Sequence, residues 1–205
     1  MLNKDRTAGI VIVCFFIFIQ ANARSQTELS VQAGYQLTGN IPVTKGDIDI
    51  KNDVNYGLGI AYRLSRGVNV VLDWDMEKTK ADLLPLSGEP YFLTNVTIHH
   101  FMAGATIDPG RGKARPFGSF TTGITLFHPE DSKYEDEIRY TIALGFGGKF
   151  YLSDRVGLTL QARLLLPLQF SGGSFWCGTG GCGLGVSSWT AFVQGDFSGG
   201  LFIRI

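Results

Sequence analysis

The sequence is poor in cysteine, in histidine and in net charge. Of its 205 residues three are cysteines and three are histidines, and 18 Lys and Arg balance 18 Asp and Glu. Because nucleic-acid binding needs a surplus of cationic side chains, the zero net charge gives no electrostatic case for it. The histidines and cysteines also lack the paired spacing of zinc ligands, so we expect no metal site and no cofactor.

Long apolar runs are missing as well. The longest covers residues 8–19, which is too short for a transmembrane helix of about 20 residues. Basic residues precede this run and the small residues 21–23 follow it, which is the arrangement of a secretory signal peptide. We therefore predict a signal peptide over residues 1–23, followed by one exported domain over residues 24–205.

Two cysteines remain once the predicted signal, which contains Cys14, is removed. Cys177 and Cys182 lie in the glycine-rich stretch "GGSFWCGTGGCG". An even number of cysteines in an exported protein favours a disulfide, and the glycines permit a tight ring. We predict that this bond holds Phe175 and Trp176 at a loop tip, either as a cap over the lumen or as a contact surface. The G-x-G-x-x-G in this stretch lacks a strand-to-helix turn, so it does not indicate a nucleotide site.

Alternation of apolar and polar residues with period two dominates the rest of the chain. In "IRYTIALGFGGKFYL" the residues Ile, Tyr, Ile, Leu, Phe and Phe alternate with charged or small ones. Such stretches run for about ten residues, longer than the mean strand of about 5–6 residues. They predict eight strands, at roughly 28–37, 54–64, 67–78, 95–107, 115–127, 138–151, 155–169 and 190–205.

The connections between these strands alternate in length. Three are short, at 65–67, 108–114 and 153–154, and four are long, at 38–53, 79–94, 128–137 and 170–189. This asymmetry is typical of outer-membrane barrels. We predict an all-β fold, an eight-stranded antiparallel up-and-down transmembrane β-barrel with short periplasmic turns and long extracellular loops. The alternative is a soluble lipocalin-like binder, because periodicity alone does not say which face points inward.

Two motifs in the last third carry a family resemblance. "DFSGGLFIRI" sets Phe197, Leu201, Ile203 and Ile205 on one face, and "IALGFGGKFYLSDRVGLTLQARL" is a glycine-rich strand followed by Leu-Ser-Asp-Arg and an apolar strand. The chain resembles the small bacterial outer-membrane barrels that are OmpA-, OmpX- and OmpW-like. The resemblance implies a Gram-negative outer membrane, contact with its lipid and lipopolysaccharide, and insertion by the barrel-assembly machinery, which would read the terminal strand.

The interior of an eight-stranded barrel is just wide enough for side chains to fill it. Because unpaired buried charges are costly, the charged residues on the less apolar face should form an ion network. We predict an Arg163–Asp196 contact near mid-membrane. The network is a structural plug or a narrow ion or proton path, and its candidate members are Asp73, Asp75, Glu77, Arg139, Lys149, Arg163, Asp196 and Arg204.

Catalytic patterns are absent from the sequence. No serine stands two residues from His99 or His100, so a lipid A-modifying acyl-transfer site finds no nucleophile and no catalytic residues are expected. We expect a non-enzymatic protein with a structural, envelope-stabilising or surface-interaction role, with any extracellular ligand bound by the long loops. The alternative is OmpW-like passage of small apolar solutes, with Pro167 breaking the barrel wall. A monomer is expected because closure removes every strand edge.

Overall fold

The computed structural model describes residues 27–43, 46–85, 89–110, 112–170, 173–178, 181–186, 189–191 and 193–205. The predicted signal peptide, residues 1–23, lies outside the described residues. Among the described residues no helix is long and apolar enough to cross a bilayer.

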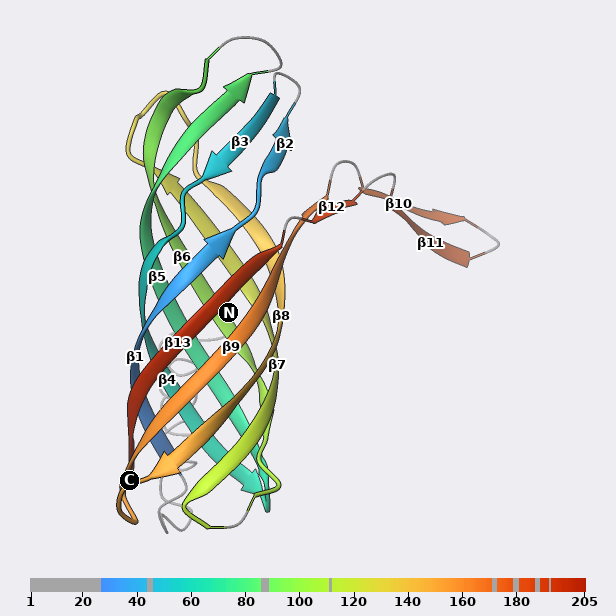
Figure 1. The fold of residues 1–205 in the computed structure, drawn as a ribbon. Coiled ribbons are helices and arrows are strands. Elements are labelled where there is room, and N and C mark those ends of the chain that lie inside the picture. Colours follow the sequence, from blue (N-terminus) through green and yellow to red (C-terminus); the bar gives the residue numbers. More distant parts are fainter. Residues whose placement is uncertain are drawn as a thin grey trace, which may run out of the picture.

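Eight long antiparallel strands form a closed barrel (Figure 1). They are β1 (Thr27–Thr38), β4 (Asp53–Ser65), β5 (Val68–Pro85), β6 (Tyr91–Ile107), β7 (Ala114–Pro129), β8 (Glu137–Tyr151), β9 (Val156–Phe170) and β13 (Gln194–Arg204). Each strand pairs with its neighbours in the chain, and β1 pairs with β13 from Glu28 opposite Arg204 to Thr38 opposite Gln194. The predicted eight-stranded antiparallel barrel is confirmed.

One end of the barrel carries the short connections and the carboxyl terminus (Figure 1). The turn between β4 and β5 needs a glycine, because Gly67 has a φ of 79° and a Cβ there would lie 2.7 Å from the carbonyl oxygen of Asp108. The Asp108 amide in turn donates to the Gly67 carbonyl at 2.7 Å. In outer-membrane barrels the short turns face the periplasm, so we assign this end to the periplasmic side.

The opposite end is more ordered than the sequence suggested. Strands β5 and β6 run on until Pro85 and from Tyr91, so most of the connection predicted at 79–94 is strand. β3 (Gly46–Ile50) pairs with the upper part of β5, and β2 (Ile41–Val43) pairs with β3. The predicted strand ended at Lys78, and polar outward residues beyond it, such as Lys80, made this part resemble a loop.

We call β2, β3, residues 78–85 of β5, residues 91–97 of β6 and residues 128–137 the extension. Lys51 fastens its base, because its Nζ lies 2.6 Å from Asp49 Oδ2 and 3.3 Å from Asp82 Oδ2. Hydrogen bonds to these two carboxylates raise the pKa of Lys51 above its ordinary value. Within the extension, β3 is therefore held to β5 by side chains as well as by the β3–β5 ladder.

Two further pieces complete the chain. β12 (Trp189–Ala191) pairs with the upper end of β9, while β10 (Gly173–Gly178) and β11 (Gly181–Val186) form a separate two-stranded sheet. The connection predicted at 170–189 is thus partly strand too.

The barrel wall is apolar outside and polar inside. Phe146 is 71% exposed and Leu160 58% exposed on the outer face, whereas Asp75, Thr125 and Asp196 are fully buried in the lumen. A soluble barrel would place these sets the other way round, because water would then cover the polar one. This distribution rules out the lipocalin-like alternative and matches the lipid-facing band of a membrane barrel.

Candidate functional site in the polar lumen

A buried charge triad occupies the middle of the lumen. Arg163 Nη1 lies 2.8 Å from Asp75 Oδ2, and Arg163 Nε lies 2.9 Å from Asp196 Oδ2. Arg163 and Asp196 are direct cross-strand partners on β9 and β13. The neighbouring strand makes room for the guanidinium, because a Cβ at Gly145 would lie 3.0 Å from Arg163 Cγ. The contact expected between Arg163 and Asp196 is therefore present, with Asp75 as a second partner.

Hydrogen bonds extend this triad across the whole lumen. Every barrel strand contributes a side chain to one continuous chain of contacts. In order, its members are Gln161, Gln32, Asp75, Arg163, Asp196, Asn55, Gln36, His100, Thr125 and Thr141, with donor-acceptor distances between 2.6 and 3.4 Å. Ser198 adds a bond of 3.1 Å to Asp196 Oδ2. A network in which the members satisfy one another is rigid and fills the space that a solute would need.

A second ionic cluster closes the periplasmic end. Glu28 pairs with Lys149 and, at 2.8 Å, with Arg204 Nη2. The hydroxyl of Tyr151 accepts from Arg204 at 2.7 Å. The ring of Phe202, 1% exposed, packs edge-on against Tyr151 at 5.1 Å between centroids. Two cations and one buried carboxylate are thus held in an aromatic collar.

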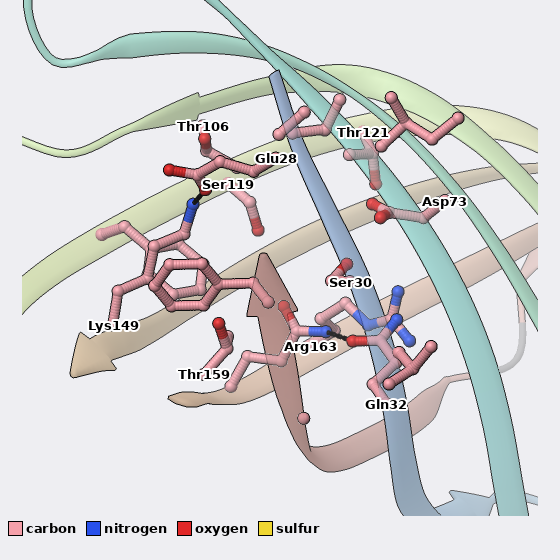
Figure 2. Close-up of a pocket in the computed structure, with 18 residues that line it drawn as sticks. Glu28, Ser30, Gln32, Asp73, Thr106, Ser119, Thr121, Lys149, Thr159 and Arg163 are labelled. Atoms are coloured by element: carbon pink, nitrogen blue, oxygen red, sulfur yellow. Dashed lines mark hydrogen bonds and ion pairs between the residues drawn. The ribbon is translucent and has the colours of Figure 1, made fainter. Parts of the chain in front are cut away.

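A cavity of about 60 Å³, lined by both polar and apolar side chains, separates the two clusters (Figure 2). It is large enough for a few water molecules, each of which needs about 10–15 Å³. Figure 2 shows Lys149 beside Glu28 at one end and Asp73 projecting into the space. Asp73 makes no hydrogen bond or ion pair with another described residue, although it lies within electrostatic reach of Arg163. It is the one predicted network member that faces this cavity without a direct partner.

The remaining predicted network members lie in the upper lumen, each in its own surroundings. Arg139 pairs with Glu137 at 2.8 Å, and its guanidinium lies 5.5 Å from the ring centre of Phe127. Glu77 is fully buried near the Asp53 backbone, yet neither carboxylate oxygen finds a hydrogen-bond partner at ordinary geometry among the described residues. The single network expected from sequence is therefore divided into three clusters, which Glu77 does not join.

Sequence reasoning missed several lumenal residues. Glu28 and Gln36 lie on the same face of β1 as Gln32, four residues to either side, so the period-two rule could have found them. His100 could not be found, because two adjacent histidines left the phase of its strand open. The structure places His100 in the lumen and stacks His99 outside, 6.0 Å from Trp74 and 6.2 Å from Phe101.

The other predicted site residues lie on the terminal strand and in the cysteine stretch. The outward face of the terminal strand carries all four residues of the expected assembly signal, Phe197, Leu201, Ile203 and Ile205. Cys177 and Cys182 are direct Cα partners across the β10–β11 hairpin. Their side chains, and those of Phe175 and Trp176, lie outside the described residues, so the disulfide and the cap stay predictions.

Pro167 does not interrupt the wall towards β8, where it pairs with Thr141 in an unbroken register. On its other side the β13 ladder ends at Leu165, and β12 resumes at Leu168. Among the described residues, no three His, Cys, Asp or Glu side chains gather as they would around a metal ion.

Above the polar lumen lies an apolar vestibule with a volume of about 230 Å³. Its walls include Ile50 from β3, Ala81 from β5, Val96 from β6 and Phe127 from β7. Arg139, the cross-strand partner of the lumenal Thr125, also lines it. The interior therefore changes from charged to apolar along the barrel axis.

No protein-family model and no curated protein sequence matches the chain. Solved structures do match its fold. Neisserial surface protein A aligns with 90% of this chain and 100% of its own at 11% identity and a TM-score of 0.61. Outer membrane protein OprG from Pseudomonas aeruginosa covers 86% of this chain and 96% of its own at 12% identity and a TM-score of 0.59. Outer membrane protein AlkL covers 91% and 93% at 13% identity and a TM-score of 0.54. With its outward apolar band, this chain has the fold of the small eight-stranded outer-membrane barrels, and its place is the outer membrane.

Proposed function

We propose that the protein is a non-conducting barrel that supports an ordered extracellular extension, with an envelope-stabilising or surface-interaction role. The observation that carries this proposal is the hydrogen-bonded chain through all eight strands. The Asp75–Arg163–Asp196 triad lies within that chain. Opening a path for ions would therefore leave buried charges without partners, at a cost of several kcal/mol. The rigid barrel supports the extension, which lies above the membrane and has its own apolar core.

Recording of single channels in planar bilayers tests this role. The wild-type barrel should give no steady conductance, and the Asp75→Ala/Arg163→Ala/Asp196→Ala variant should open a small water-filled path. Leu164→Ala is the matched control, because Leu164 follows Arg163 on β9 but faces outward. Heat-modifiable gel migration checks that each variant is folded. Steady conductance of wild type, at the level of a porin or of a narrow ion channel, contradicts the proposal.

The same proposal assigns no catalytic role to the protein. His100 contacts Gln36 and Thr125, and His128 contacts the exposed Asp136 at 2.6 Å. His100 and Thr125 are both buried in the lumen, away from the lipid on which acyl transfer would act, and His128 contacts a carboxylate instead of a hydroxyl or thiol nucleophile. Mass spectrometry of lipid A from overexpressing cells should show no change in acyl chains or phosphates, and a new lipid A species would contradict this part.

A second role, the uptake of small apolar solutes, is favoured by the vestibule. Its 230 Å³ suit a molecule such as naphthalene, but the polar network below blocks direct passage. Saturable naphthalene binding to the barrel in nanodiscs, weakened by Ala81→Leu and not by the outward Lys80→Gln, would establish the vestibule as a binding site. Accelerated entry of naphthalene into vesicles would show transport and favour this role over a closed scaffold.

A further inference from the structure

Three neighbouring strands change polarity at the same height. On the outer face, Met76 of β5, His99 of β6 and Leu126 of β7 lie in one cross-strand row, and Lys78, Thr97 and His128 lie in the next row above it. The row between them points inward and holds the buried Glu77, Ile98 and Phe127. On β5 and β7 apolar-out becomes polar-out within one step, from Met76 to Lys78 and from Leu126 to His128. On β6 the outward His99 is already polar, and its ring stacks beside Trp74 and Phe101 below Thr97.

This change marks the outer boundary of the membrane. On β6 the outward band runs from Ile107 to His99, a stretch that agrees with the roughly 9–11 residues of a transmembrane strand. Because the turns at the Ile107 end face the periplasm, the Lys78 row lies at the extracellular surface. We call Lys78, Lys80, Asn95 and Thr97 the headgroup patch.

The two lysines of the patch are exposed and unengaged. Lys78 and Lys80 make no side-chain hydrogen bond or ion pair to any residue in the described part of the chain. Nearby acids already have partners. Glu130 accepts from Asn95 at 2.8 Å, Asp136 contacts His128, and Asp82 contacts Lys51. Two cations are thus left facing outward at the height where lipid phosphates lie.

An apolar groove lies lower on the same face, separated from the patch by the row of Met76 and His99. It has a volume of about 410 Å³ and is lined by Leu58 and Leu72, the rings of Trp74 and Phe101, and the small Ala103. Trp74 precedes Lys78 by four residues, which is about 13 Å along a strand. An acyl chain in the groove would therefore reach a headgroup at the lysines.

We propose that this face binds one lipid A unit of lipopolysaccharide, with its phosphate on Lys78 and Lys80 and an acyl chain in the Trp74–Phe101 groove. Phosphate suits this patch because lysine binds it as a point charge, without the planar geometry that arginine requires. The site gives the proposed envelope role a partner, but it does not depend on a closed lumen, so lipid binding and conductance can fail separately.

Native mass spectrometry of the barrel, released from lipid A-doped phosphatidylcholine nanodiscs, tests the site. Wild type should retain one lipid A, and Lys78→Gln/Lys80→Gln should lower the apparent affinity about tenfold or more. The matched control is Arg66→Gln/Lys113→Gln, which removes two exposed charges from the periplasmic turns and should leave binding unchanged. Ala103→Phe, which fills the groove but keeps both lysines, should also weaken binding. Heat-modifiable migration confirms folding of each variant.

The lipid itself supplies the remaining arms of this test. Dephosphorylated lipid A should bind wild type and the lysine variant equally, because the interaction removed is the same. Equal retention of lipid A by wild type and the lysine variant would overturn the proposal. So would an equal loss in the periplasmic control, or retention of phosphatidylglycerol as strong as that of lipid A, which would show a general preference for anionic lipid.

Discussion

The membrane-spanning part of the barrel and the extension above it are built from the same strands with opposite polarity. On β5 the outward side chains change from Leu72 and Trp74 to Lys78 and Lys80, while the inward ones change from Asp75 to Ala81. The β5–β6 ladder continues through this change in one register from Val68 to Ala81, while on the other edge of β5 the partner changes from β4 to β3. A period-two pattern therefore fixes the strand, and the surroundings of each segment decide which face must be apolar.

The comparison also separates two kinds of core. The spanning part is stabilised inside by charges and hydrogen bonds, which are worth holding only when every member has a partner. The extension is stabilised inside by Ile50, Ala81 and Val96, as in a soluble protein. Substitutions should therefore act differently in the two regions, and the predictions below begin with the largest effect.

Removing the central cation should damage the spanning part most. Arg163→Met keeps much of the side-chain volume but leaves Asp75 and Asp196 buried without their partner, so the free energy of unfolding should fall by about 3–5 kcal/mol. Urea unfolding in lipid vesicles, followed by tryptophan fluorescence, measures it. Adding Asp75→Asn and Asp196→Asn should recover part of the loss. If the triple variant is less stable than Arg163→Met, the loss of unfolding free energy does not come from unpaired buried carboxylates.

A charge placed on the outer face should locate the boundary between the two regions. Ile124→Arg lies within the lipid band and should lower the free energy of unfolding by about 2–4 kcal/mol, whereas His128→Arg, in the extension, should change it by about 0–1 kcal/mol. Both residues face outward on β7, so they form a matched pair. Equal effects in the same vesicle titration would move the boundary above His128 or below Ile124.

Glu77 stands at the junction of the two cores and should behave unlike its neighbour. Glu77→Gln removes a buried carboxylate that has no hydrogen-bond partner at ordinary geometry, so it should raise the free energy of unfolding by about 1 kcal/mol. Asp75→Asn, two residues earlier on the same face, should lower it by about 3 kcal/mol because Arg163 depends on that charge. A loss of stability in Glu77→Gln would mean that its carboxylate has a partner in solution.

The same contrast explains which features of the fold and of the lumen the sequence could predict. The eight strands were predictable because alternation persists over their whole length, and the Arg163–Asp196 pair followed from counting residues from the strand ends. The extension was missed because the polarity of the two faces reverses along β5 and β6, so the predicted strand ended at Lys78 and residues 79–94 were interpreted as a connection. The partition of the charges was not predictable either, since it depends on cross-lumen distances such as that between Arg163 on β9 and Asp75 on β5, which the sequence does not contain.

The smallest effect is expected where a strand pair is separate from both regions. The β10–β11 hairpin shares no ladder with the barrel, and its two cysteines stand opposite each other as Cα partners. We predict that Cys177 and Cys182 form a disulfide, which should appear as a mass increase of about two thiol blocks only after reduction. Because that bond closes a short loop within one hairpin, Cys177→Ser/Cys182→Ser should change the free energy of barrel unfolding by less than about 0.5 kcal/mol. A larger loss would show that the hairpin packs on the barrel and that the cysteine stretch belongs to the fold it stands above.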